Sequence, residues 1–338
     1  MTRVRDPHLT NLLLGHPSFL QDYWKNHEIP PGTINASLES GRVWEMDYWN
    51  RKSLLSPSLE KAILQIHQTL KNAETEDRHI VVGCGATQLI SAAAFALVKR
   101  GVRSFHSTAP YWPRFPDLTK IGAIGEKVTW SSHSTEGCQI ITTPSNPTNA
   151  IAQKSGSPQG WAIYDLCYNW PQYSAPIHWD EDIMIFSLAK ATGHASTRIG
   201  WALVKDEKLA WDMRRYIDLS TTGVSVHSEE VAAYILSSQA ERDFDQSCFH
   251  FGKTRLENRW KRLQNSALFR CDEIEILNRN GMFLWGKTGN PETVATQFLK
   301  DRFQIRSLDG KACGSTSDYF RINLGCPESE FEWLESIE

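Results

Sequence analysis

The sequence predicts an α/β protein in which a mostly parallel β-sheet lies between helices, followed by a smaller α+β domain. Short apolar segments rich in β-branched residues alternate with helical segments between residues 79 and 204, and longer helices dominate after about residue 220. Alternating strands and helices form parallel sheets that helices cover on both faces. Because 338 residues exceed the usual length of one domain, we expect an N-terminal arm over residues 1–50, a large domain over 51–220 and a small C-terminal domain over 221–338.

The first predicted elements surround a glycine-containing turn. Apolar residues recur at helical spacing from Ser58 to Lys71, which predicts a helix. The β-branched run His79–Val82 predicts a strand, and the alanine-rich segment Gln88–Arg100 predicts the helix after it. The turn Gly83–Thr87 is therefore expected at the N-terminus of a helix.

Further short strands continue the large domain. They are predicted at Arg103–His106, Gln139–Thr142, Trp161–Tyr164, Ile183–Phe186 and Gly200–Val204. Helices are then predicted over residues 206–219, 229–245 and 253–266, with strands of the second domain at Gly281–Trp285 and Tyr319–Asn323.

The composition favours a cytoplasmic protein that binds small molecules. A formal net charge of −3 gives no general attraction to nucleic acid or to an anionic membrane. No apolar run approaches the length of about 18 residues that crosses a membrane, and the N-terminal apolar run is too short for a secretory signal. The seven cysteines are odd in number and never spaced C-x-x-C, and no histidine pair has zinc-binding spacing. We therefore expect neither a disulfide framework nor a metal site.

Polar residues follow three of the predicted strands, at positions 144–149, 165–168 and 187–200. In an open parallel sheet, ligands bind just beyond the carboxyl ends of the strands. These three groups are far apart in the sequence, yet this topology predicts that they meet in one crevice.

The residue types in this crevice suit a pyridoxal ring. Asp165 ends an apolar strand, where a carboxylate needs a cationic partner such as a protonated pyridine nitrogen. Tyr168 and Asn146 can serve the phenolic oxygen of the ring. Burial of Lys190 would lower the pKa of its amine and favour imine formation.

A phosphate site is predicted beside the lysine. Ser187 and Arg198 flank Lys190, and an arginine fork next to a hydroxyl group binds a phosphate dianion well. The turn Gly85-Ala86-Thr87 adds backbone N–H donors at a helix N-terminus. Tyr111 is expected to stack on the face of the ring.

Other interpretations of these residues are weaker. Taken singly, a strand-terminal aspartate is most often a helix cap, and a lysine or arginine is most often solvated. Gly83-x-Gly85 resembles a dinucleotide-binding turn, but the third glycine is replaced by Gln88. Ser187-x-x-Lys190 resembles a box of the penicillin-recognising serine hydrolases, but here the serine ends a strand instead of opening a helix.

Two segments carry a family resemblance that spans most of the chain. Residues 163–171 and 187–202 resemble the alliinase and plant tryptophan-aminotransferase branch of the fold-type I pyridoxal-phosphate (PLP) enzymes. The resemblance implies the aspartate-aminotransferase fold, with PLP held by Lys190 as a Schiff base. It implies the following contacts to the cofactor: Asp165 on the pyridine nitrogen, Asn146 and Tyr168 on the ring hydroxyl, Ser187 and Arg198 on the phosphate, and Tyr111 on the ring face.

The resemblance also implies substrate and subunit contacts. Arg321 corresponds to the arginine that binds the substrate α-carboxylate, and Gly15 lies in a substrate-binding stretch in which His16 replaces an acid. Asn146 is expected near the substrate as well. Tyr48 corresponds to a tyrosine that reaches the phosphate of the neighbouring subunit, which implies a homodimer with shared active sites.

The function implied is that of an aminotransferase that moves the amino group of an aromatic, tryptophan-like L-amino acid to a 2-oxo acid. Lys190, Asp165 and Tyr168 are the expected catalytic residues. A C–S lyase that acts on cysteine sulfoxides is the main alternative, because it shares every step as far as the carbanion. The cysteine-rich module of plant alliinases is missing, which favours the aminotransferase. A third hypothesis is a non-catalytic ligand-binding homologue.

Overall fold

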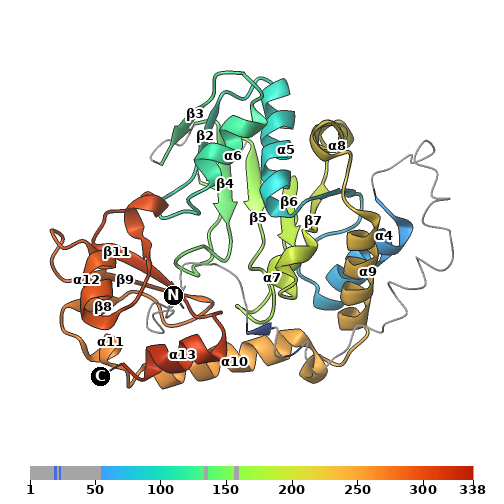
Figure 1. Ribbon diagram of the computed structural model, residues 1–338. Coiled ribbons are helices and arrows are strands. Elements are labelled where there is room, and N and C mark those ends of the chain that lie inside the picture. The colour runs from blue at the N-terminus through green and yellow to red at the C-terminus, as the bar shows by residue number, and fades with distance from the viewer. Residues whose placement is uncertain (1–18, 21–22, 24–54, 133–135, 156–159, 338) are drawn as a thin grey trace, which may run out of the picture.

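A large, mostly parallel sheet forms the centre of the molecule, as the sequence predicts. The structure, a computed structural model, describes residues 19–20, 23, 55–132, 136–155 and 160–337 (Figure 1). The strands in sheet order are β1 (His79–Gly83), β7 (Gly200–Val204), β6 (Ile183–Ser187), β5 (Ala162–Asp165), β4 (Cys138–Thr142), β2 (Ser104–His106) and β3 (Thr129–Ser131). β7 is antiparallel to both of its neighbours, and the other pairs are parallel.

The alternation of side chains along each strand separates two hydrophobic cores. In β6, Ile183 and Ile185 face one core, whereas Met184 and Phe186 face the other. Because side chains of a strand point alternately to the two faces of a sheet, strands that are apolar throughout need cover on both faces.

Helices supply this cover (Figure 1). The first core includes α5 (Ala86–Lys99), α6 (Phe115–Gly122) and α8 (Glu207–Thr221), and the second includes α4 (Pro57–Leu70), α9 (Val226–Ala240) and α10 (Cys248–Leu263). Ser56 caps α4 through its hydroxyl group, and Asp206 caps α8 through its carboxylate.

A smaller antiparallel sheet forms the second unit. Its strands in order are β10 (Leu308–Asp309), β11 (Tyr319–Asn323), β9 (Phe283–Thr288) and β8 (Ile274–Ile276). The helices of this part are α11 (Ala267–Arg270), α12 (Ala295–Phe303) and α13 (Glu328–Glu335). In Figure 1 this unit, in orange and red, lies beside the carboxyl ends of the large sheet, and α10 runs beneath both.

The structure departs from the expected boundaries mainly at short elements. α9 ends at Ala240 rather than at residue 245, because Phe244–Gln246 forms a 3-10 turn and Ser247 caps α10 by accepting a hydrogen bond from the backbone N–H of His250. Helices α6, α12 and α13 were not expected. The arm over residues 1–50 lies almost wholly outside the described residues, so the three-part division stays a prediction.

Candidate active site

A cavity of about 610 Å³ lies at the carboxyl ends of the central parallel strands. A volume of this size suits a bound small molecule. Eight predicted site residues line it: Ala86, Thr87, Asn146, Asp165, Tyr168, Ser187, Lys190 and Arg321, and Arg198 lines it as a ninth. The topology therefore brings together residues that are up to 235 positions apart in the sequence, from Ala86 to Arg321.

Asp165 is the last residue of β5 and is only 4% exposed. Its carboxylate accepts hydrogen bonds from the Thr142 hydroxyl (3.2 Å) and the Cys167 backbone N–H (3.3 Å). Burial raises the pKa of Asp165, and these hydrogen bonds offset part of that effect. Within the described part of the chain no lysine or arginine forms an ion pair with this carboxylate, so the site provides a buried carboxylate suited to a cationic ligand atom.

A chain of hydrogen bonds crosses the cavity from the large sheet to the small one. The Arg321 guanidinium, on β11, donates to Asn146 Oδ1 (2.7 Å), and Asn146 Nδ2 donates to the Tyr168 hydroxyl (3.3 Å). All three side chains are buried. Burial raises the pKa of Tyr168, so the phenol keeps its proton and can donate it in a hydrogen bond.

Lys190 follows directly after β6, in the one-turn helix α7 (Leu188–Ala191). Burial lowers the pKa of its amine to about 8. Its backbone carbonyl accepts hydrogen bonds from the Tyr173 hydroxyl (2.8 Å) and the Gln172 amide (3.1 Å), which fix the position of the main chain. The amine therefore has an appreciable neutral, nucleophilic fraction near neutral pH.

The opposite end of the cavity is formed by the N-terminus of α5 and by Arg198. Gly85 precedes the helix with a φ of +80°, a conformation that glycine adopts without strain. The Arg198 guanidinium donates to the carbonyl of Cys84 (3.0 Å), and a Cβ atom on Gly85 would lie 2.9 Å from Arg198 Nη2. Thr87 and Ser187 add hydroxyl groups, so backbone N–H groups, hydroxyls and a guanidinium converge as a phosphate requires.

The aromatic residue on the cavity wall is Trp112. Tyr111, for which the sequence predicts a stacking role, is not among the lining residues. Its ring packs against Trp130 at 5.2 Å between centroids, and its hydroxyl accepts a hydrogen bond from the Trp130 indole (3.2 Å). Pro113, Arg114 and Leu308 also line the cavity and were not found from the sequence.

Two predicted site residues, Gly15 and Tyr48, lie outside the described residues. Their assignments to the substrate and to the partner subunit stay predictions. No group of three or more histidine, cysteine, aspartate or glutamate side chains suited to a metal ion occurs among residues 55–132, 136–155 and 160–337 or at the few described positions before them.

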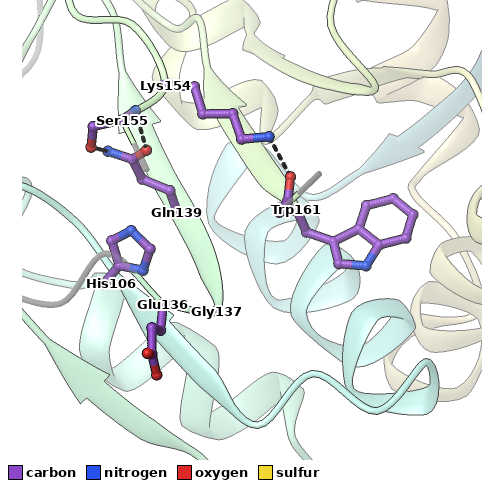
Figure 2. A pocket seen from close by; sticks show the side chains of 8 residues that line it. His106, Glu136, Gly137, Gln139, Lys154, Ser155 and Trp161 are labelled. Atoms are coloured by element: carbon purple, nitrogen blue, oxygen red, sulfur yellow. Dashed lines mark hydrogen bonds between the residues drawn. The ribbon is translucent and has the colours of Figure 1, made fainter. Parts of the chain in front are cut away.

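A second pocket, of about 240 Å³, lies near the amino ends of β4 and β5 (Figure 2). Its polar centre is Gln139, whose amide donates to the Ser155 hydroxyl (2.9 Å) and whose oxygen accepts from the Ser155 backbone (2.8 Å). His106 faces it with 2% of its surface exposed and no hydrogen-bond partner for either ring nitrogen among the described residues. The pocket shares no residue with the larger cavity.

The donor set of the larger cavity fits PLP. The buried carboxylate of Asp165 matches a protonated ring nitrogen, the Asn146–Tyr168 pair matches the ring hydroxyl, and the Arg198 end matches the phosphate. The amine of Lys190 lines the same cavity, where it can reach the aldehyde carbon.

Comparisons with known proteins agree with this assignment. The family model described as allinase matches residues 10–337. Tryptophan aminotransferase-related protein 2 of Arabidopsis thaliana is 31% identical over 94% of this chain and 78% of its own length. Alliin lyase of Allium cepa var. aggregatum is 32% identical over 95% of this chain and 78% of its own length.

Solved structures share the fold at lower identity. A Thermus thermophilus aspartate aminotransferase double mutant superposes with a TM-score of 0.73 and 15% identity, over 96% of this chain and 89% of that chain. The aromatic aminotransferase from Pyrococcus horikoshii OT3 gives a TM-score of 0.70 and 16% identity, over 96% and 94%. The predicted aspartate-aminotransferase fold is therefore confirmed.

Proposed function

The chain belongs to the allinase family and is a PLP-dependent enzyme, and we propose that it is an aminotransferase. Its amino donor is an aromatic L-amino acid such as tryptophan, and its acceptor is a 2-oxo acid. The observation that carries the proposal is the joint placement of Lys190, Asp165 and Arg321 around one cavity. Names of relatives that include tryptophan aminotransferase-related proteins support the donor class.

Each residue has a distinct part in this proposal. When bound, PLP supplies a ring that withdraws electrons from the substrate α-carbon. Lys190 removes the α-proton and returns a proton to the cofactor carbon, and its pKa of about 8 suits both tasks near neutral pH. Asp165 keeps the ring nitrogen protonated, because a buried carboxylate stabilises a cation beside it.

The remaining contacts orient the two reactants. Arg321 binds the substrate α-carboxylate, and its hydrogen bond to Asn146 fixes the guanidinium. Trp112 lines the cavity beside the ring and, with Leu308, gives apolar contact to an aromatic donor. We assign the stacking role to Trp112, because Tyr111 packs against Trp130 instead.

A C–S lyase is the second candidate, supported by 32% identity to an alliin lyase. Both reactions use the same residues to remove the α-proton. They differ in what happens next: a lyase expels the sulfur group and releases pyruvate, whereas an aminotransferase returns the proton to the cofactor. We favour the aminotransferase because of the apolar wall that Trp112 and Leu308 form in the substrate cavity.

Absorption spectroscopy tests the proposal. Wild-type protein with PLP should show the visible band of a lysine-bound cofactor, and L-tryptophan should bleach it. Lys190→Ala should show neither the band nor the bleaching, whereas Lys208→Ala, which removes an exposed lysine from α8, should behave as wild type. No visible band in the wild type with PLP would overturn the proposal. Pyruvate released from a cysteine sulfoxide without any 2-oxo acid would favour the lyase.

We also propose a cytoplasmic homodimer with shared active sites. The match of Tyr48 to the tyrosine that reaches a neighbouring subunit supports the dimer. All seven cysteines lie in the described residues as free thiols, which suits a reducing compartment. Among the described residues, no helix combines the length and apolar character needed to cross a membrane.

A further inference from the structure

The active-site cavity has more positive charge than a monocarboxylic substrate needs. Four cationic side chains line it, those of Arg114, Lys190, Arg198 and Arg321, whereas Asp165 is the one carboxylate among its lining residues. An excess of like charges in a cavity favours anionic ligands and repels cationic ones. The surplus therefore carries information about the substrates, which deepens the proposed function and depends on it.

Three of the cations already have partners in the proposed reaction. Arg198 binds the cofactor phosphate, Arg321 binds the α-carboxylate, and Lys190 reacts with the cofactor as a neutral amine. Asp165 is matched by the ring nitrogen. Arg114 is then the one cation of the cavity wall without an anionic counterpart.

Arg114 is placed to meet a ligand at the cavity mouth. It follows Trp112 and Pro113 on the wall and precedes α6, and its side chain is exposed. No described carboxylate forms an ion pair or hydrogen bond with its guanidinium, whereas Arg100 and Arg103 nearby in the sequence are both paired with acids. Because Arg114 is solvated when the cavity is empty, it needs no permanent partner.

We propose that Arg114 binds the distal carboxylate of a dicarboxylic substrate, so that the amino acceptor is a dicarboxylic 2-oxo acid of four or five carbons. Arg321 binds the α-carboxylate and Arg114 binds the second one. An aromatic donor uses the same space by packing on Trp112, while the long Arg114 side chain moves into solvent. One site thereby accepts an apolar donor and an acidic acceptor.

The exchange balances over the two substrates. The donor loses its C–N bond and its Cα–H bond and gains a carbonyl oxygen from water. The acceptor loses its carbonyl oxygen as water and gains the amino nitrogen and a hydrogen at its α-carbon. The electron pair of the donor Cα–H bond ends in the acceptor Cα–H bond, so no external oxidant or reductant is needed.

Binding of unreactive acids tests the proposal without turnover. Succinate and butyrate have four carbons each but differ by one carboxylate, so their affinities for the PLP-loaded protein, measured by calorimetry, report the second contact. We expect succinate to bind about tenfold more tightly than butyrate, which is typical of one solvent-accessible charge-assisted contact. Arg114→Leu should remove this preference and leave butyrate binding unchanged, and Arg114→Lys should keep part of it.

Arg215→Leu is the matched control, because it removes an exposed arginine from α8, away from the cavity wall. It should keep the wild-type preference. In activity assays with tryptophan as donor, Arg114→Leu should lower kcat/KM about tenfold for 2-oxoglutarate but not for pyruvate. Equal affinity of succinate and butyrate for the wild type, or an unchanged preference in Arg114→Leu, would overturn the proposal.

Failure of the proposed function gives a different result. The bleaching of the cofactor band by tryptophan requires no acceptor, so it tests transamination without involving Arg114. Bleaching together with an absent succinate preference would refute only the role of Arg114. Absent bleaching would refute the aminotransferase, and with it the assignment of a dicarboxylic acceptor.

Discussion

Lys190 is the residue whose chemistry depends most on its surroundings. An exposed lysine amine is protonated at neutral pH and reacts slowly with aldehydes. Burial after β6 lowers its pKa to about 8, and the nearby cations Arg321 and Arg198 act in the same direction, whereas Cys167 and Asp165 oppose it. The balance keeps a useful fraction of the amine neutral in the physiological range.

This shift predicts the pH dependence of cofactor capture. The neutral amine is the nucleophile, and it is populated above its pKa. The rate constant for PLP capture by the apoprotein should therefore rise between about pH 7 and 8 and level off above about pH 9. Stopped-flow absorbance measures this rate constant. A rate that keeps rising through pH 10, as for an ordinary lysine, would show that the amine is not shifted.

The residue types that carry chemistry could be found from the sequence, but their facing could not. Asp165, Lys190 and Arg198 were identified because each follows a predicted strand, where a parallel sheet places ligands. Tyr111 and Trp112 are adjacent aromatic residues, and no pattern in the sequence tells which ring faces the cavity. Arg114 gave no signal because a single exposed arginine is usually solvated.

At the scale of elements, the close contact of β7 with the N-terminus of α5 shapes the phosphate end of the cavity. Gly200 allows this approach: a Cβ atom there would lie 2.7 Å from both the Ala86 nitrogen and the Gly85 carbonyl carbon. These are backbone atoms and cannot move aside as a flexible side chain can. The turn that holds the phosphate donors therefore depends on a residue outside the cavity.

Gly200→Ala should destabilise the protein by about 1–3 kcal/mol, as overpacking of a core does, and weaken PLP binding because the turn Gly85–Thr87 is displaced. Denaturant unfolding and PLP titration measure the two effects. Gly289→Ala is the control, since the nearest atom to its added Cβ is 3.8 Å away. Unchanged stability and PLP affinity in Gly200→Ala would mean that the contact is looser than described.

An ion-pair cluster joins α10 to α13. Glu328 accepts hydrogen bonds from Arg255 (2.6 Å), from Arg259 (2.6 Å) and from Arg262 (2.8 Å). Burial by itself raises the pKa of Glu328, but the hydrogen bonds from the arginines outweigh it and lower the pKa to about 2 from an ordinary 4.5. Arg259 is fully buried, so loss of this carboxylate would leave its charge without an ionic partner.

The lowered pKa predicts a loss of stability in acid. A carboxylate whose pKa is lower in the folded state stabilises the protein above its unfolded pKa, and this contribution is lost as the pH falls from about 4.5 to about 2. Glu328→Gln should therefore be less stable than wild type by about 2–3 kcal/mol near pH 6, and the difference should shrink toward pH 2. Glu332→Gln, an exposed α13 carboxylate, should match wild type. A Glu328→Gln deficit that is the same at both pH values would contradict the assignment. Unfolding by urea at several pH values provides the measurement.

Long, regular elements were predictable, whereas short ones were not. Strands β1, β6 and β7 lie within one residue of the expected segments, because apolar β-branched runs leave little alternative. The three-residue strands β3 and β8 have too few residues to show a period. The packing of the rest of the molecule determines these elements more than their own sequence does.

At the scale of the whole molecule, the active site exists only where the two sheets meet. Arg321 comes from the small sheet and binds Asn146, on the loop after β4 of the large one. A second link lies beside it: Asn149 donates hydrogen bonds to the carbonyls of Asn280 (2.7 Å) and Phe283 (2.8 Å). Substrate recognition is therefore tied to the docking of the C-terminal unit. The sequence alone could not predict these contacts, because they join segments more than 130 residues apart.

The same dependence should extend to a second copy of the chain. If Tyr48 completes the phosphate site of the neighbouring subunit, Lys190→Ala and Tyr48→Ala damage sites in different ways. Each homodimer then has two defective sites. In a heterodimer, the subunit that retains Lys190 receives the intact Tyr48 of its partner, so one of the two sites is complete. Equal co-expression with random pairing makes half of the dimers mixed, and activity should return to about a quarter of the wild-type value. If Tyr48 instead served its own subunit, every site in the mixture would carry a defect and activity would not return. The activity of the co-expressed pair, compared with that of each variant alone, therefore decides whether the active site is shared.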